Sequence, residues 1–253
     1  IEDFLRPEII LFGVDDKKAA EKAKKFYRTI NHAPFYETTI ENAELIKVTY
    51  NTYIGTKIAF VNNVMEMCHH LPNTNVDDVM NALKMCDVRI ISDKYLSGGM
   101  GDGGGCHPRD NIALSWLSDK LGVSFNWFDN IMKQREVQTE MFADLIEEHY
   151  EDKKICILGK SFKPETNLTV GSPAILLKNI LEDRGHEVFN WDPHVDDWDI
   201  VLDEKPCCYF IGTKHPEFIS FPYEKGSVII DPWRYISDID GCTVIRYGDN
   251  IND

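Results

Sequence analysis

Four short apolar runs in the second half of the chain constrain its fold more than any other feature. They read "KKICILG", "HEVFNWDP", "CCYFIGT" and "GSVIIDPW", and each ends at a Gly or an Asp-Pro pair. Residues 171–185 lie between the first two runs and predict a helix, with Ser172 as N-cap, Pro173 in the first turn and Gly185 at the end. Short strands that alternate with a helix of this length predict a parallel, doubly wound sheet from residue 151 onward.

Helical patterns dominate the first half of the chain, residues 14–150. The longest, over residues 40–71, contains no Pro and carries apolar side chains on nearly every face. We therefore expect a helix buried on several sides, in a core or against a second subunit. Shorter helices are expected over 15–30, over 75–85 with Asn75 as N-cap, and in two stretches before residue 150. The stretch "APFYETT", residues 33–39, is expected to be extended. With a strand at 7–13, the sequence predicts three parts: residues 1–13, a helical domain over 14–150 and an α/β domain over 151–253.

The formal net charge of −15 excludes several classes of partner. A chain this acidic is repelled by nucleic acid and by anionic membrane surfaces, so we expect neither as a partner. No apolar run approaches the ~20 residues that span a bilayer, and the opening "IEDFLRPE" has no signal-peptide pattern. The 7 cysteines lack the even number and spacing of a disulfide framework, which predicts free thiols in a reducing, cytoplasmic compartment.

The stretch "SGGMGDGGGCHPRDN", residues 97–111, admits two interpretations. Gly99, Gly101 and Gly104 match the dinucleotide-binding pattern G-x-G-x-x-G. That pattern needs a strand before the glycines and a βαβ unit around them, whereas a helical hairpin follows here. We therefore interpret the match as a coincidence of spacing. The Cys and His residues at 68–70 and 106–107 lack the spacing of zinc ligands, so we expect no metal site.

The second interpretation makes Cys106 a nucleophile. Pro108 suits the first turn of a helix, so Cys106 would lie at a helix N-terminus, where N–H groups and the helix dipole stabilise a thiolate. Arg109 adds positive charge, and Asp110 returns to the same side as an acid, base or orienting group. The glycines would let a substrate approach the sulfur closely. A buried cysteine beside a flexible turn remains the alternative.

Two further groups carry candidate chemistry. Lys47 and Asn51, four residues apart, share a face of the long helix and are either donors for a developing oxyanion or a Lys that extends to solvent. The loop "GKSFKPET", residues 159–166, follows a strand, where a doubly wound sheet binds ligands. Lys160 and Lys163 offer charge for a phosphate and Phe162 an aromatic face, although a plain basic loop is the alternative.

These motifs, in this order, resemble those of the UDP-glucose/GDP-mannose dehydrogenase family. The loop "GDGGGCHPRD" resembles the family's catalytic-cysteine loop G-F-G-G-S-C-F-P-K-D. The stretch "AELIKVTYNTYIGTKIAFVNN" resembles its helix with catalytic Lys and Asn. "GKSFKPETNLTVGSPA" resembles G-L-A-F-K-P-x-T-D-D-x-R-x-S-P-A, "DFLR" resembles E-F-L-R, and "WDPHV" resembles the family's Asp-Pro strand end. The five motifs are in register and cover nearly the whole chain.

The resemblance implies NAD-dependent oxidation of a UDP-hexose, with UDP-glucose expected, to the uronic acid in two hydride transfers. Cys106 would trap the aldehyde as a thiohemiacetal and then carry a thioester. Lys47 and Asn51 would stabilise the oxyanion and hold the water, while Asp110 and Asp3 would serve hydrolysis. Arg109 is a candidate cofactor contact. The implied UDP-sugar site comprises Phe4, Leu5, Arg6, Arg89, Tyr95, Leu96, Gly103, Phe162 and Lys163. The long helix would form the core of a homodimer.

Several departures from the family pattern leave alternatives open. Residues 1–13 resemble the end of the family's NAD-binding Rossmann domain, so we expect the rest of that domain to be absent. Such a partial chain would bind a UDP-sugar without turning it over. Asp3 stands where the family has Glu, and Asn167, Leu168 and Val170 stand in the D-D-x-R segment. A redox-inactive, dimeric nucleotide-sugar-binding module is therefore the second hypothesis, and an unrelated thiol enzyme is the third.

Overall fold

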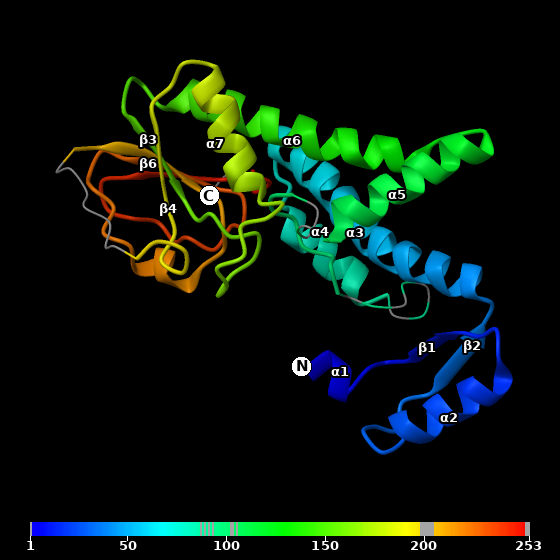
Figure 1. Ribbon diagram of the computed structural model, residues 1–253. Helices are drawn as coiled ribbons and strands as arrows, with labels where there is room; N and C mark the ends of the chain where they lie inside the picture. The colour runs from blue at the N-terminus through cyan, green and yellow to red at the C-terminus, as the bar shows by residue number, and fades with distance from the viewer. Residues whose placement is uncertain are drawn as a thin grey trace. The chain divides into compact units, whose positions relative to one another are not determined.

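The protein divides into two compact units, Ile1–Asn51 and Thr52–Asp253. Its structure, a computed structural model, describes residues 2–86, 88, 90, 92, 94–101, 104, 106–197 and 205–250, without the side chain of residue 3 (Figure 1). The long helix α3 (Ile40–His70) begins in the first unit and continues into the second. The domain boundaries expected at residues 13 and 150 stay predictions.

The first unit contains a βαβ arrangement. α1 (Glu2–Leu5) precedes β1 (Ile10–Gly13), and α2 (Lys17–Tyr27) connects β1 to β2 (Phe35–Thr38). The two strands pair in parallel, from Ile10 opposite Phe35 to Gly13 opposite Thr38. β2 lies in the stretch "APFYETT", residues 33–39, which the sequence predicts to be extended. Its residues are half-buried or exposed, so it lacks the continuous apolar run of a buried strand.

The second unit opens with helices that match the predicted ones closely. They are the rest of α3, α4 (Val76–Lys84), α5 (Cys106–Leu121) and α6 (Trp127–His149). Asn75 caps α4 as predicted, because its Oδ1 accepts hydrogen bonds from the N–H groups of Asp77 (2.7 Å) and Asp78 (3.2 Å). α3 is buried over a broad arc from Thr52 to Cys68, and Phe60 and Met67 on the remaining side are more than half exposed. The described residues therefore leave that side of the helix largely uncovered.

The remainder of the second unit is a five-stranded, all-parallel sheet, which confirms the predicted doubly wound fold. Its elements are β3 (Lys154–Leu158), α7 (Pro173–Asp183), β4 (Val188–Trp191), β5 (Cys207–Ile211), the 3₁₀ helix η1 (Pro216–Ser220), β6 (Val228–Asp231) and β7 (Thr243–Arg246). The strand order is β4-β3-β5-β6-β7. Ser172 lies at the N-cap position of α7 as predicted, but its side chain makes no capping hydrogen bond to the described residues.

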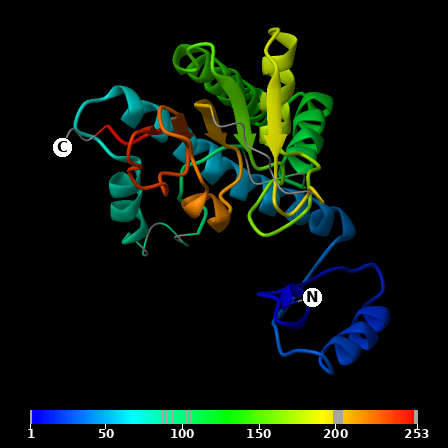
Figure 2. The same cartoon turned by 90° about the vertical axis from the view of Figure 1, so that its left-hand side faces the viewer.

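Both faces of this sheet are buried, which explains why its strands read as continuous apolar runs. One face, with Ile157 and Phe210, packs against helices that include α6 and α7 (Figures 1 and 2). The other face, with Leu158 and Tyr209, packs against aromatic residues of the loops and η1, among them Phe218. In the part of the chain that the structure describes, none of the helices is both long and apolar enough to cross a bilayer.

Candidate active site

The carboxyl ends of β3 and β5 form the topological switch point of the sheet. The chain continues from β3 to β4 on one side, and β5 lies on the other, so the loops after these two strands diverge. Ligands of doubly wound sheets bind in the crevice at this point. Residues 159–163 follow β3 and residues 212–215 follow β5. The loop "GKSFK" therefore lies at the carboxyl end of the strands, as the sequence predicts.

Asp192, just after β4, places its own carboxylate at the carboxyl end of the sheet, in a position that an anionic ligand could otherwise take. Its Oδ2 accepts hydrogen bonds from the N–H groups of Lys160 (2.6 Å) and Ser161 (2.9 Å). Burial alone would raise the pKa of this carboxyl. Hydrogen bonds from His215 and from the backbone outweigh burial and hold the pKa of Asp192 well below its usual range. The carboxylate thus occupies backbone donors that a ligand phosphate would otherwise use.

The two lysines of this loop differ in what they can bind. The Nζ of Lys160 lies 2.7 Å from Asp196 Oδ1, and both side chains are largely buried. A carboxylate of the same chain thus holds Lys160, and its expected role as a phosphate ligand stays a prediction. Lys163 is exposed, and its Nζ lies 5.6 Å from the centre of the Phe162 ring. Of the two, Lys163 is the one placed for an anionic ligand.

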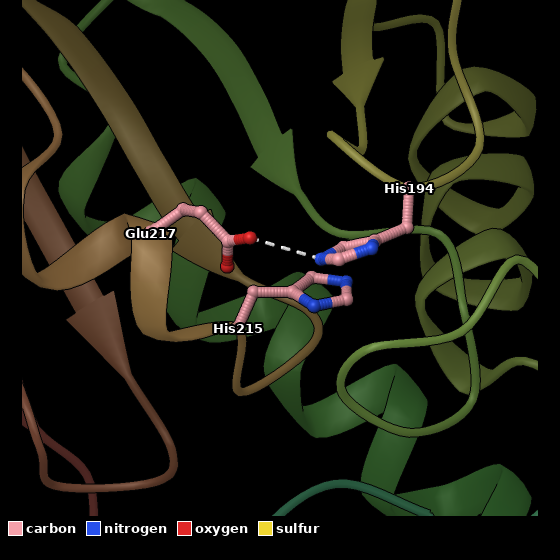
Figure 3. Close-up of side chains that lie close together, drawn as sticks. All are labelled: His194, His215 and Glu217. Atoms are coloured by element: carbon pink, nitrogen blue, oxygen red, sulfur yellow. Dashed lines mark hydrogen bonds and ion pairs between the residues drawn. The ribbon is translucent and has the colours of Figure 1, made fainter.

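Three groups at this edge, His194, His215 and Glu217, lie close enough to suggest a metal site (Figure 3). His215 is fully buried, its Nδ1 accepts the N–H of Glu165 (3.2 Å), and its Nε2 lies 3.1 Å from Asp192 Oδ2. The two imidazole rings are stacked, with centres 4.6 Å apart and planes 25° apart. Both ring nitrogens of His215 are therefore engaged, and stacked rings do not aim their lone pairs at one point. We assign this cluster a structural role.

The glycine loop contacts the α/β part of the unit at three of its glycines. A Cβ built on Gly99 would lie 2.1 Å from the Trp233 ring, one on Gly101 2.8 Å from Pro173, and one on Gly104 2.2 Å from the Phe162 ring. Side chains of distant segments thus occupy the space above these backbones. For these described positions, the expectation that the glycines clear room for a substrate is wrong: they permit close packing of the loop.

Cys106 is the first residue of α5 and is exposed, as predicted for a thiol at a helix N-terminus. Asp110 is buried in the first turn, 3.2 Å from the Nε of Arg109. The Gly104 carbonyl accepts the N–H of His107 (3.3 Å), so the residue that touches Phe162 also joins the first turn of α5. The structure therefore brings the Phe162 ring to the segment that carries Cys106.

The other cysteines of the chain have different surroundings. All 7 are free thiols, and Cys68, Cys156, Cys207 and Cys208 are buried. Burial raises the pKa of the Cys208 thiol to about 12. Buried thiols of this kind are poor nucleophiles, which leaves the exposed Cys106 and Cys86 and the partly exposed Cys242.

The structure places the remaining predicted site residues as follows. Leu96 is buried beside a groove along α3, and Tyr95 is half exposed with a φ of 65°. Lys47 and Asn51 lie one turn apart on α3 and belong to the first unit, as do the exposed residues Phe4, Leu5 and Arg6. The Asp3 side chain, Arg89 and Gly103 lie outside the described residues. The roles of all these residues stay predictions.

Sequence reasoning missed the residues that hold the glycine loop. Trp233 follows β6, and Asn62 and Gln138 lie on α3 and α6, so none is near residue 100 in the chain. The available signal was the density of glycines, which indicates close backbone approach without naming the partner. Arg234, also missed, pairs with Asp77 (Nε to Oδ2, 2.8 Å) and donates to the Gly98 carbonyl (3.0 Å).

Fold and site define a class of protein: a helical part with a thiol at a helix N-terminus, joined to a doubly wound domain whose strand-end loop touches the thiol's segment. Comparisons with known proteins agree. Residues 41–136 match the sequence model of the UDP-glucose/GDP-mannose dehydrogenase family, central domain. The UDP-glucose 6-dehydrogenases of Rhizobium meliloti (strain 1021) and Rickettsia conorii are 34% and 30% identical over 206 and 197 residues, which cover 76% of this chain.

Solved structures show the same likeness over more of the chain. A UDP-glucose dehydrogenase from Pyrobaculum islandicum superposes with a TM-score of 0.86 at 25% identity, covering 98% of this chain and 60% of that one. A UDP-D-ManNAc dehydrogenase from Pyrococcus horikoshii gives 0.82, also at 25% identity, covering 98% and 62%. The chain spans about half the length of the curated relatives it matches. It belongs to the UDP-glucose/GDP-mannose dehydrogenase family.

Proposed function

We propose that this chain is part of an NAD-dependent nucleotide-sugar dehydrogenase that oxidises UDP-glucose to the uronic acid. The observation that carries the proposal is the meeting of two loops. Phe162, after β3, lies against Gly104, whose carbonyl accepts the N–H of His107 beside Cys106. A nucleotide held at the switch point would thus lie near the exposed thiol.

In the proposed reaction, the Cys106 sulfur attacks the carbonyl carbon of the sugar aldehyde, and the carbonyl oxygen takes a proton to give a thiohemiacetal. Loss of hydride from that carbon and of the proton from its hydroxyl leaves a thioester, which water cleaves to the carboxylate with return of the thiol. Asp110, in the first turn of α5, orients or deprotonates the water. Lys47 and Asn51, and Asp3 for hydrolysis, keep their proposed roles from the family resemblance.

NAD would accept the hydride in both oxidations. Arg109 is the residue of this chain that we assign to it. Its side chain is 65% exposed, three residues after Cys106, and so offers a cation to a dinucleotide phosphate.

We also propose a homodimer formed through α3. Tyr53, Phe60 and Met67 recur every seven residues on this helix and are 61%, 55% and 60% exposed. Beside them, an apolar groove of about 400 Å³ is bordered by Phe60, Leu96 and Trp127. A seven-residue apolar repeat next to an open groove suits the antiparallel or crossed packing of a second copy of the helix.

Isothermal titration with UDP and UDP-glucose tests the substrate site. We expect Lys163→Ala to weaken UDP binding about tenfold, since a charge-assisted contact to phosphate is lost. The matched control is Lys154→Ala, because Lys154 also lies over a Phe ring (5.0 Å to Phe189) but at the opposite end of β3. Lack of binding by the unsubstituted protein at millimolar UDP would refute the substrate site.

A redox-inactive nucleotide-sugar-binding module is the second candidate function. Leu168 and Val170, in the segment where the family carries charged residues, are 53% and 81% exposed. Formation of NADH by the complete protein of which we propose this chain is a part, mixed with UDP-glucose and NAD, distinguishes the two: the module would bind UDP-glucose without producing any. Alkylation of Cys106 that UDP-glucose does not slow would instead favour an unrelated thiol enzyme.

A further inference from the structure

Two buried side-chain amides hold the backbone of the glycine loop. The Gly99 N–H donates to Asn62 Oδ1 (3.0 Å), and Asn62 Nδ2 donates to the Gly101 carbonyl (2.8 Å). In the reciprocal sense, the Gly101 N–H donates to Gln138 Oε1 (3.0 Å), and Gln138 Nε2 donates to the Gly99 carbonyl (3.0 Å). Every backbone donor and acceptor of these two glycines is thus satisfied by one of two amides.

The residue type at these two positions follows from this geometry. Asn62 is 2% and Gln138 5% exposed, and both glycines are buried, so none of these groups can turn to water instead. An amide is the side chain that offers a donor and an acceptor on one planar group. A carboxylate would keep the acceptor and lose the donor, and an aliphatic residue would leave two backbone groups unsatisfied.

The two amides come from different helices, α3 and α6, so the loop is tied to both. Asn62 Nδ2 also lies 3.4 Å from Gln138 Oε1, which joins the two side chains to each other. Further along, Gly101 rests on Pro173 and Gly104 on Phe162, and the Gly104 carbonyl accepts the N–H of His107. The segment before Cys106 is therefore anchored at residues 99, 101 and 104.

We infer that Asn62 and Gln138 are positioning residues for Cys106. Their hydrogen bonds go to the backbone of Gly99 and Gly101 and to each other, so they act on Cys106 through that backbone. The inference rests on the proposed role of Cys106 as the nucleophile. Loss of one amide leaves buried backbone groups without hydrogen-bond partners. The loop then adopts other conformations, and these change the start of α5.

Peptide-resolved alkylation with iodoacetamide tests this, with Cys86 as an internal reference because it too is exposed. The readout is the ratio of the Cys106 rate to the Cys86 rate, together with protection of Cys106 by UDP-glucose. We expect the ratio to fall about tenfold in Asn62→Leu, the equivalent of one buried hydrogen bond, and less in Asn62→Asp, which keeps the acceptor for the Gly99 N–H. Gln138→Glu should behave like Asn62→Asp.

Asn126→Ala is the matched control. Asn126 is also an amide that links α5 to α6, through Ser115 (2.9 Å to its Oγ), and it caps α6, but it does not touch the glycine loop. It should lower the melting temperature and leave the ratio unchanged. A ratio that stays constant in the Asn62 and Gln138 variants would overturn the inference. Absence of UDP-glucose protection in the unsubstituted protein would instead count against the proposed function, because the ratio still reports the loop.

Discussion

At the residue scale, Asp192 shows how one side chain organises the edge of a sheet. It is the Asp of an Asp-Pro pair that is visible in the sequence, but its partners at residues 160, 161 and 215 come from two other segments, after β3 and after β5. Its carboxylate accepts backbone N–H groups where a nucleotide-binding loop of another doubly wound protein would bind phosphate. We therefore expect anion recognition at this end of the sheet to rest on Lys163, which is exposed.

Asp192→Asn tests this role through stability. The pKa of Asp192 in the folded protein is depressed, so the carboxylate contributes stability at pH values above the unfolded value of about 3.9. That contribution is lost as the pH falls through the folded-state value. We expect the substitution to lower the free energy of unfolding at pH 7 by about 2 kcal/mol and to flatten its decline in acid. Urea denaturation at several pH values measures both effects.

The charge-matched control for this experiment is Asp197→Asn. Asp197 lies on the same loop and is exposed. Its loss should change stability little at any pH. Equal decreases in the free energy of unfolding of the two variants at pH 7 would contradict the assignment of Asp192 as a buried hydrogen-bond acceptor.

At the scale of elements, the glycine loop is a joint between the helical part and the doubly wound part of the second unit. Gly99 meets Trp233, which is fixed by its Nε1 donating to the Ile211 carbonyl (3.0 Å). Gly104 meets Phe162, and α5 begins two residues later. Glycine is needed at Gly104 for two separate reasons, a φ of +96° and the aromatic ring above it.

A pair of Gly→Ala variants separates those two reasons. Gly104 and Gly185 both have a φ of +96°, but a Cβ on Gly185 would meet no described atom within 4 Å. We expect Gly185→Ala to lower the free energy of unfolding by about 1 kcal/mol, through backbone strain alone, and to leave UDP binding unchanged. Gly104→Ala should lower the free energy of unfolding further and should also weaken UDP binding, because Phe162 must move. Urea denaturation and titration with UDP measure these effects, and equal binding by both variants would contradict the contact.

At the scale of the whole molecule, α3 leaves an apolar stripe uncovered. Its burial follows one side, from Ile54 through Val61 to Met65, while Tyr53, Phe60 and Met67 stay open. A helix with apolar residues on nearly every face is expected to bury more than one side. The described residues leave the side with Tyr53, Phe60 and Met67 largely uncovered, which is the physical argument for a second copy.

Phe60→Glu tests the dimer. A charge at the centre of the stripe would be desolvated on association, so we expect a monomer by sedimentation equilibrium at concentrations where the unsubstituted protein is dimeric. Leu121→Glu, which changes a 67% exposed residue at the end of α5, should leave the association state unchanged. A monomer for the unsubstituted protein would refute the dimer itself.

The sequence by itself determined the parallel sheet, most helix boundaries and the place of Cys106 at the start of α5. Buried parallel strands and capped helices carry their signal locally, in apolar runs, N-caps and Gly ends. β7 escaped it, since none of its residues is buried. The tertiary structure alone decided what the glycines pack against and which lysine is held by a carboxylate of the same chain. Trp233, Asn62 and Gln138 lie far along the chain from Gly99, as Asp196 does from Lys160, and no local pattern encodes a contact made only when distant segments pack.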